Sequence, residues 1–162
     1  MWRIHWFLVA LALLAACAAA PTFDSSGVDS ALTPRRVAAQ LQDASGKRVL
    51  WGGVILAITN LSERTDIEVL AYPLDTDNRP RRDDDPLGRF IIELAGYLEP
   101  ASYSEGRLVT VAGTVSRAVP GKIGASDYAY PVVAAQQLYL WPRASGYDGT
   151  SVHFGIGVGI GF

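Results

Sequence analysis

The chain has 162 residues, with 14 Lys and Arg residues against 16 Asp and Glu residues, so its net charge is −2. It lacks the basic excess that nucleic-acid binding requires, and we expect no nucleic-acid partner. One cysteine and two histidines exclude an internal disulfide and leave too few ligands for a zinc site. We therefore also expect no metal and no cofactor.

The first 16 residues have the layout of an export signal. Arg3 supplies a positive charge, an apolar run covers Trp6 to Leu14, and the small residues Ala15 and Ala16 follow. The apolar run is shorter than the roughly 20 residues that a membrane-spanning helix needs. We expect residues 1–16 to be a signal peptide.

The only cysteine follows this signal directly. Leu14-Ala15-Ala16-Cys17 resembles the lipobox of bacterial lipoproteins, which implies that the Cys17 thiol is diacylated and becomes the new N-terminus. One acyl chain holds weakly, whereas two or more anchor a protein stably. Ala18 follows, and the absence of Asp at this position resembles the outer-membrane pattern. The alternative is an ordinary signal peptide with a chance cysteine.

Residues 17–46 are predicted to form a tether and one short helix. The tether is small and polar and contains proline. Thr33 is suited to cap the helix and Pro34 to occupy its first position, with the helix continuing over 35–42.

Residues 47–143 have the composition and alternation of an all-β domain. Five strands are expected, over residues 49–58, 65–72, 89–95, 107–117 and 130–141. Gly52-Gly53 is expected to supply a bend or bulge, and Pro120-Gly121 a turn. Five strands with a loop or helical turn after the third are typical of a small OB-like barrel, and a sandwich is the alternative.

Two segments have an unusual composition. The loop over residues 74–87 mixes acids with three arginines. It has two interpretations: a calcium site, or a solvated loop whose positive and negative charges balance each other. The spacing of its acids does not match a calcium-binding loop. Residues 144–162 form a Gly-rich tail in which bulky apolar residues alternate with glycine. The tail has three interpretations: an added strand, a flexible tail, or a contact with membrane or a partner.

Catalytic residues are scarce once the signal is removed. His153 is the remaining histidine, so a Ser-His-Asp arrangement would depend on it. Glycoside hydrolysis would require carboxylates to converge from the set Glu68, Glu93, Glu99 and Glu105. Exposed, solvated charges explain the same residues, and we expect the protein not to be an enzyme.

Aromatic residues offer a different kind of site. Those suited to a sugar- or peptide-binding face are Trp51, Tyr72, Tyr97, Tyr103, Tyr128, Tyr130, Tyr139 and Trp141. Core packing explains most of them equally well. The local candidate for a ligand contact is the 127–131 stretch, with Tyr128 and Tyr130 as the contact residues.

Several blocks of the sequence, in order, resemble the Slp family of outer-membrane lipoproteins, named for starvation-inducible members. These blocks are Trp51–Ile55, Glu68–Leu74, Gly88–Phe90, Leu98–Pro100, Gly106–Gly113 and Tyr130–Val133. The resemblance implies a lipoprotein anchored in the outer membrane by its N-terminal lipid, on the periplasmic face, with a link to starvation or stress.

The family supplies no accepted active site. We therefore expect a non-enzymatic structural, protective or interaction role, with an unidentified envelope protein or glycan as partner. The alternative is a binding module for a glycan, peptide or small ligand on the barrel face.

Overall fold

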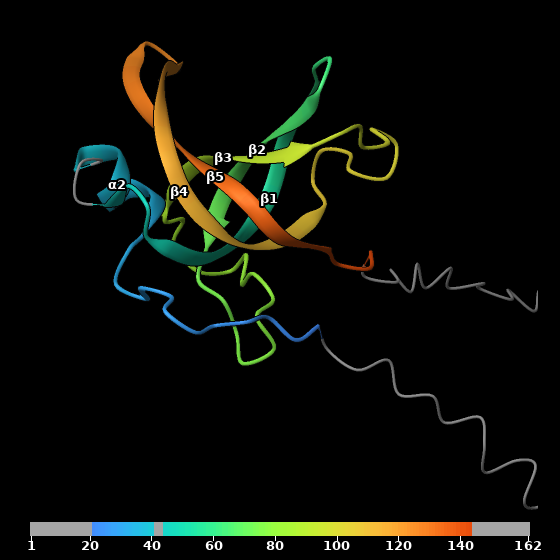
Figure 1. Cartoon of the computed structure of the whole chain (residues 1–162), viewed down its shortest axis with the longest axis horizontal. Coiled ribbons are helices and arrows are strands. Elements are labelled where there is room, and N and C mark those ends of the chain that lie inside the picture. The colour runs from blue at the N-terminus through green and yellow to red at the C-terminus, as the bar shows by residue number, and fades with distance from the viewer. Residues whose placement is uncertain (1–20, 41–43, 144–162) are drawn as a thin grey trace, which may run out of the picture.

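The computed structural model describes residues 21–40 and 44–143, which form a closed five-stranded barrel preceded by a short helix (Figure 1). The elements are α2 (Pro34–Ala39), β1 (Arg48–Asn60), β2 (Arg64–Tyr72), β3 (Gly88–Ala95), β4 (Leu108–Ile123) and β5 (Ser126–Leu140). The predicted all-β barrel with a helix before its first strand is confirmed. Cys17 and the Gly-rich tail lie outside the described residues.

The barrel closes in the order β1-β2-β3-β5-β4 and returns from β4 to β1. All pairs are antiparallel except β3 and β5, whose parallel ladder covers only Ile91–Glu93 against Val132–Ala134. This closed order is OB-like and excludes the sandwich. Residues 96–107, between β3 and β4, consist of turns and irregular backbone.

The barrel interior is filled with apolar side chains. Alternate residues of β2, Ile67, Val69 and Ala71, are buried, as their spacing predicts. Trp51 meets Phe90 edge to face, with 5.2 Å between ring centroids. Small barrels of this kind enclose a packed core rather than a channel, and this core fixes the outer surface on which any site must lie.

The glycines of the first strand allow close packing, but the bulge of this strand lies elsewhere. Gly52 and Gly53 pair in regular register with Tyr72 and Ala71, and the register shifts only between Ile55 and Ala57. The predicted bulge at Gly52-Gly53 is therefore wrong. A Cβ atom on Gly53 would collide with the carbonyl group of Leu70, so this glycine lets β2 approach closely.

The predicted turn at Pro120-Gly121 is also wrong. β4 continues to Ile123, and the turn falls at Gly124, whose φ is +61°. Pairing of β4 with β1 ends at Thr114, so within residues 21–40 and 44–143 the only strand that pairs with β4 at Pro120 is β5. A proline without an N–H is tolerated at such an edge. The β4–β5 hairpin projects beyond the barrel, away from the N-terminal side (Figure 1).

The short helix begins as predicted. The Thr33 hydroxyl accepts a hydrogen bond from the Arg36 N–H at 3.3 Å, and Pro34 occupies the first turn. The helix ends at Ala39, before the expected end at residue 42. Val37 is fully buried, so α2 packs one face into the barrel core.

Candidate functional site

Residues 21–33, which we call the N-terminal segment, lie against the barrel (Figure 1). Hydrogen bonds fasten the segment along its length: Gln137 Nε2 donates to the Thr22 carbonyl at 2.7 Å, the Asp29 N–H donates to the Arg48 carbonyl at 3.1 Å, and Trp51 Nε1 donates to the Leu32 carbonyl at 2.9 Å. Val28 also forms a parallel bridge with Arg48. The predicted tether region is thus bound to the barrel over its described part.

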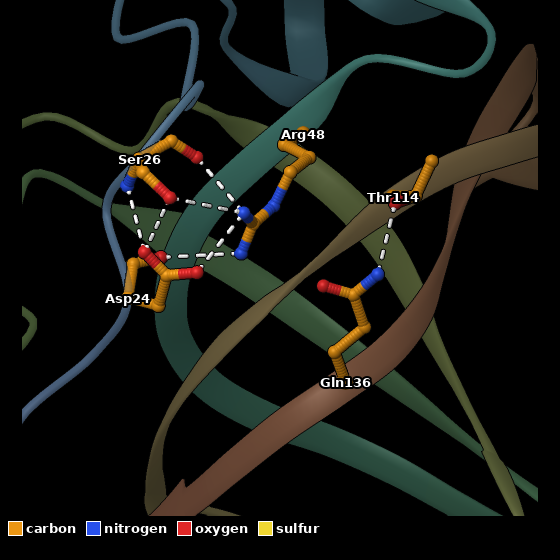
Figure 2. Close-up of polar contacts among 5 residues, drawn as sticks. All are labelled: Asp24, Ser26, Arg48, Thr114 and Gln136. Atoms are coloured by element: carbon orange, nitrogen blue, oxygen red, sulfur yellow. Dashed lines mark hydrogen bonds and ion pairs between the residues drawn. The ribbon is translucent and has the colours of Figure 1, made fainter.

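Asp24, Ser26 and Arg48 form a polar clamp at the start of β1 (Figure 2). Arg48 Nη1 lies 3.1 Å from Asp24 Oδ2 and donates to the Ser26 carbonyl at 2.9 Å. The Ser26 hydroxyl and N–H both donate to Asp24 Oδ1, at 2.6 and 3.0 Å. These bonds from Ser26, reinforced by Arg48, lower the pKa of Asp24 to about 2.

A second polar contact ties β4 to β5 beside the clamp. Gln136 Nε2 donates to the Thr114 hydroxyl at 3.4 Å (Figure 2). Thr114 is also the β4 residue that pairs with Arg48. The clamp therefore rests on a part of the barrel where β1, β4 and β5 are joined.

Tyr128, one of the two predicted ligand contacts, lies on β5 and links this strand to β3 through hydrogen bonds. Its hydroxyl donates to the Arg89 carbonyl at 2.9 Å and accepts from the Arg89 N–H at 3.1 Å. These two bonds extend the contact between the strands beyond their three-residue parallel ladder. Burial raises the pKa of Tyr128, which keeps its hydroxyl neutral and able to donate.

Tyr130, the other predicted contact, packs edge to face against Tyr128 at 4.9 Å between ring centroids. It is 8% exposed, and its hydroxyl donates to the Lys122 carbonyl at 3.0 Å. Both hydroxyl groups thus bond to the protein itself. A shallow hollow of about 280 Å³ adjoins Tyr128, and its lining residues are Pro120, Gly121, Asp127, Tyr128 and Ala129.

The other aromatic residues do not share one face. Trp51 and Trp141 are 5% and 6% exposed and belong to the core, whereas Tyr97 is 68% exposed on the 96–107 segment. Trp141 Nε1 donates to the Thr110 hydroxyl at 2.9 Å. Core packing, the second interpretation of these aromatics, accounts for both tryptophans.

Two of the four glutamates considered for catalysis are held by arginines on the strands. Glu68 Oε1 lies 2.9 Å from Arg89 Nη1. Glu93 Oε2 lies 2.6 Å from Arg117 Nη2 and 3.3 Å from Arg64 Nε. The hydrogen bond from Arg117, then the charge of Arg117 and that of Arg64, lower the pKa of Glu93. A low pKa suits an ion pair and opposes a role as general acid at neutral pH.

Two acids of the 74–87 loop, Asp75 and Asp84, make contacts within the loop itself. Asp75 Oδ1 accepts from the N–H groups of Asp77 and Arg79, and Arg81 forms an ion pair with Asp84. Within residues 21–40 and 44–143, no three His, Cys, Asp or Glu residues are grouped as metal ligands.

Four arginines that are far apart in the sequence line one hollow of about 440 Å³. We call this the arginine hollow; its arginines are Arg79, Arg82, Arg107 and Arg143, and its remaining lining is Ser104, Glu105, Gly106, Leu108 and Pro142. The arginines come from the 74–87 loop, the approach to β4 and the residues after β5. The sequence carries no signal for this site, because only barrel closure brings these segments together.

Two of these guanidinium groups are held in place. Arg107 donates to the Ser102 carbonyl and to the Trp141 carbonyl, each at 2.8 Å. The Arg79 guanidinium carbon lies 5.4 Å from the centroid of the Trp141 ring, in cation–π geometry. Carbonyl oxygens and an aromatic face orient these side chains without neutralising their charge.

The fold and the clamp define a small β-barrel domain to which the N-terminal segment before it is fastened. The family model described as "Outer membrane lipoprotein Slp family" matches residues 14–155. The chain belongs to this family and is an envelope lipoprotein of the outer membrane, as the resemblance implied. Within the described part of the chain, no helix is long and apolar enough to cross a membrane.

Three relatives support this placement. An uncharacterized protein of Haemophilus influenzae is 34% identical over 90% of this chain and 80% of its own length. The uncharacterized lipoprotein YeaY of Escherichia coli is 33% identical over 59% of this chain and 49% of its own length. The outer membrane protein Slp of E. coli is 28% identical over 80% of this chain and 69% of its own length.

Proposed function

We propose that a lipid on Cys17 holds the protein at the periplasmic face of the outer membrane, where its barrel has a non-enzymatic structural, protective or interaction role. Membership in a family of outer membrane lipoproteins supports the lipid, together with the position of Cys17 directly after the signal. The structural observation that carries the proposal is the clamp between Asp24 and Arg48.

The hydrogen bonds that hold the N-terminal segment on the barrel limit how far the barrel can lie from a lipid on Cys17. Thr22, the first residue hydrogen-bonded to β5, follows Cys17 by five residues. Five residues of fully extended chain span at most about 18 Å. A lipid on Cys17 would therefore hold this side of the barrel close to the membrane surface, as expected for a protein that acts there.

Substitution of the cysteine tests the anchor. Cys17→Ser should abolish labelling with radioactive palmitate and release the protein from washed membranes, because the thiol that carries the lipid is gone. Ala18→Ser, a change of similar size at the next residue, should keep both the label and the membrane association. Wild-type protein that stays on membranes without any label would contradict the proposal.

The proposed protective role has its own test. A deletion strain should lose envelope integrity in stationary phase, measured as leakage of a periplasmic marker or sensitivity to detergent. Wild-type protein should restore the barrier and Cys17→Ser should not. If the deletion strain and its parent have the same envelope integrity under starvation, the proposed link to starvation is contradicted. The proposal of a lipid anchor on Cys17 is not affected by that result.

A second candidate function is a binding module for a glycan, peptide or small ligand. The hollow beside Tyr128 favours it, because this hollow lies on the projecting hairpin. Glycan fragments and short peptides should then raise the melting temperature of the full chain saturably. Asp127→Asn, at an exposed residue of this hollow, should weaken that shift. A shift that is unchanged in this variant would place the ligand elsewhere.

A further inference from the structure

We propose that the arginine hollow binds the phosphate of a lipid headgroup in the membrane that holds the protein. The site's location at the membrane rests on the proposed function, whereas its phosphate chemistry rests on the hollow alone. Guanidinium groups present paired N–H donors that match phosphate oxygens, so clustered arginines are suited to this anion.

The charge of the hollow has no internal balance. Among the described residues, none of its four arginines forms an ion pair, and Glu105 is the single acid in its lining. Five other arginines of the described chain pair with acids: Arg48, Arg64, Arg81, Arg89 and Arg117. The side chains of Arg35 and Arg36 instead donate to the backbone carbonyls of Pro86 and Ala31. The protein as a whole carries a net charge of −2, so this local positive excess does not reflect a generally basic chain.

The geometry of the hollow suits an anion that enters from outside. Arg107 is fixed by two carbonyl groups and Arg79 lies over Trp141, so both are oriented before any ligand binds. Arg82 and Arg143 are exposed, and their side chains make no hydrogen bond within the described residues. The two oriented guanidinium groups and the two exposed ones would together surround a phosphate at the rim of the hollow.

The 74–87 loop links the arginine hollow to the side of the barrel that carries the N-terminal segment. The N-terminal segment and the 74–87 loop line a common hollow of about 390 Å³, and the Arg35 N–H donates to the Leu87 carbonyl at 2.9 Å. The same loop contributes Arg79 and Arg82 to the arginine hollow. Segment and loop lie together below the barrel in Figure 1.

This placement favours a lipid over free phosphate as the ligand. The chain between Cys17 and Thr22 reaches at most about 18 Å, so headgroups would surround this side of the barrel at high local concentration. A phosphate that is already part of the membrane surface would add a second attachment to that of the N-terminal lipid.

The test uses the full chain, purified from membranes in a neutral detergent. Calorimetric titration is carried out with short-chain phosphatidylglycerol, short-chain phosphatidylcholine and inorganic phosphate. The test variant is Arg82→Gln with Arg143→Gln, at exposed residues that hold no other described contact. The matched control is Arg81→Gln with Lys122→Gln, which removes two positive charges outside the hollow.

Wild type and control should bind phosphatidylglycerol saturably and at least about tenfold more tightly than the test variant, with inorganic phosphate and phosphatidylcholine weaker. Equal binding by the test variant, or no saturable binding by wild type, would overturn the proposal. Inorganic phosphate that binds as tightly as phosphatidylglycerol would overturn the lipid assignment. Because the protein is in detergent, these results do not depend on acylation of Cys17, so failure of the anchor is seen separately.

Discussion

Arg48 and Asp24 join the first strand of the barrel to the chain that leads back to Cys17, with 3.1 Å between Nη1 and Oδ2. The same guanidinium group also donates to two backbone carbonyls of the N-terminal segment, those of Asp24 and Ser26. One side chain of β1 therefore holds both the backbone and the carboxylate of this segment. The position of the barrel relative to its proposed lipid depends on this contact.

Loss of the clamp should loosen the N-terminal segment without unfolding the barrel. In Asp24→Asn, we expect amide hydrogens of residues 22–31 to exchange several-fold faster, because the charge-assisted bonds to Arg48 and Ser26 are weakened. Hydrogen exchange followed by mass spectrometry measures this. Asp127→Asn, whose carboxylate pairs with Lys122 on the projecting hairpin, is the control and should leave the segment unchanged.

Acid should release the same segment. The folded protein lowers the pKa of Asp24 from 3.8 to about 2, so the ionised carboxylate stabilises the clamp above pH 3.8. That stabilisation is lost as the pH falls through about 2, where the folded form takes up its proton. NMR titration of the Asp24 carboxyl group and exchange at residues 22–31 should change together. Protection that falls with pH in the same way in Asp24→Asn would contradict this assignment.

Tyr128 should contribute to stability through its hydroxyl group. Tyr128→Phe removes two hydrogen bonds to Arg89, at about 0.5–1.5 kcal/mol each, so we expect the free energy of unfolding to fall by about 1–3 kcal/mol. Tyr139→Phe is the matched control, because the Tyr139 ring packs on Trp141 and its hydroxyl makes no hydrogen bond within the described residues. Chemical denaturation that gives the two variants the same free energy of unfolding would contradict the role of the Tyr128 hydroxyl in linking β5 to β3.

Gly53 should tolerate no side chain. Gly53→Ala places a Cβ atom against the Leu70 carbonyl group of β2, and relief requires the two strands to separate. We expect a loss of about 1–3 kcal/mol in the free energy of unfolding. Gly96→Ala, at a position with open space but a φ of +85°, should cost only about 1 kcal/mol. Thermal denaturation of both variants makes the comparison.

Local patterns were enough to predict the elements of this barrel. The alternation of Ile67, Val69 and Ala71 identified a half-buried strand, and Thr33 with Pro34 identified the start of the helix. Local rules failed at Pro120-Gly121 because the residue pattern of a turn also suits a strand edge that has lost one neighbour. Whether an edge is free depends on barrel closure, which no short window contains.

For the candidate sites, as for the strands, residue types follow from the sequence but contacts between distant segments do not. Composition predicts Tyr128 and Tyr130 as ligand contacts, whereas their hydroxyl partners, Arg89 and Lys122, follow from strand pairing. The arginine hollow could not be predicted, because only barrel closure brings its segments together. Within the 74–87 loop, Arg81 pairs with Asp84, whereas Arg79 and Arg82 line the hollow with arginines from other segments.

Mass spectrometry of the N-terminal peptide of the protein isolated from membranes tests the central claim most directly. The account predicts a peptide that begins at Cys17 and carries the added mass of acyl chains. A membrane-associated protein whose peptide keeps residues 1–16, or whose Cys17 is unmodified, would contradict it.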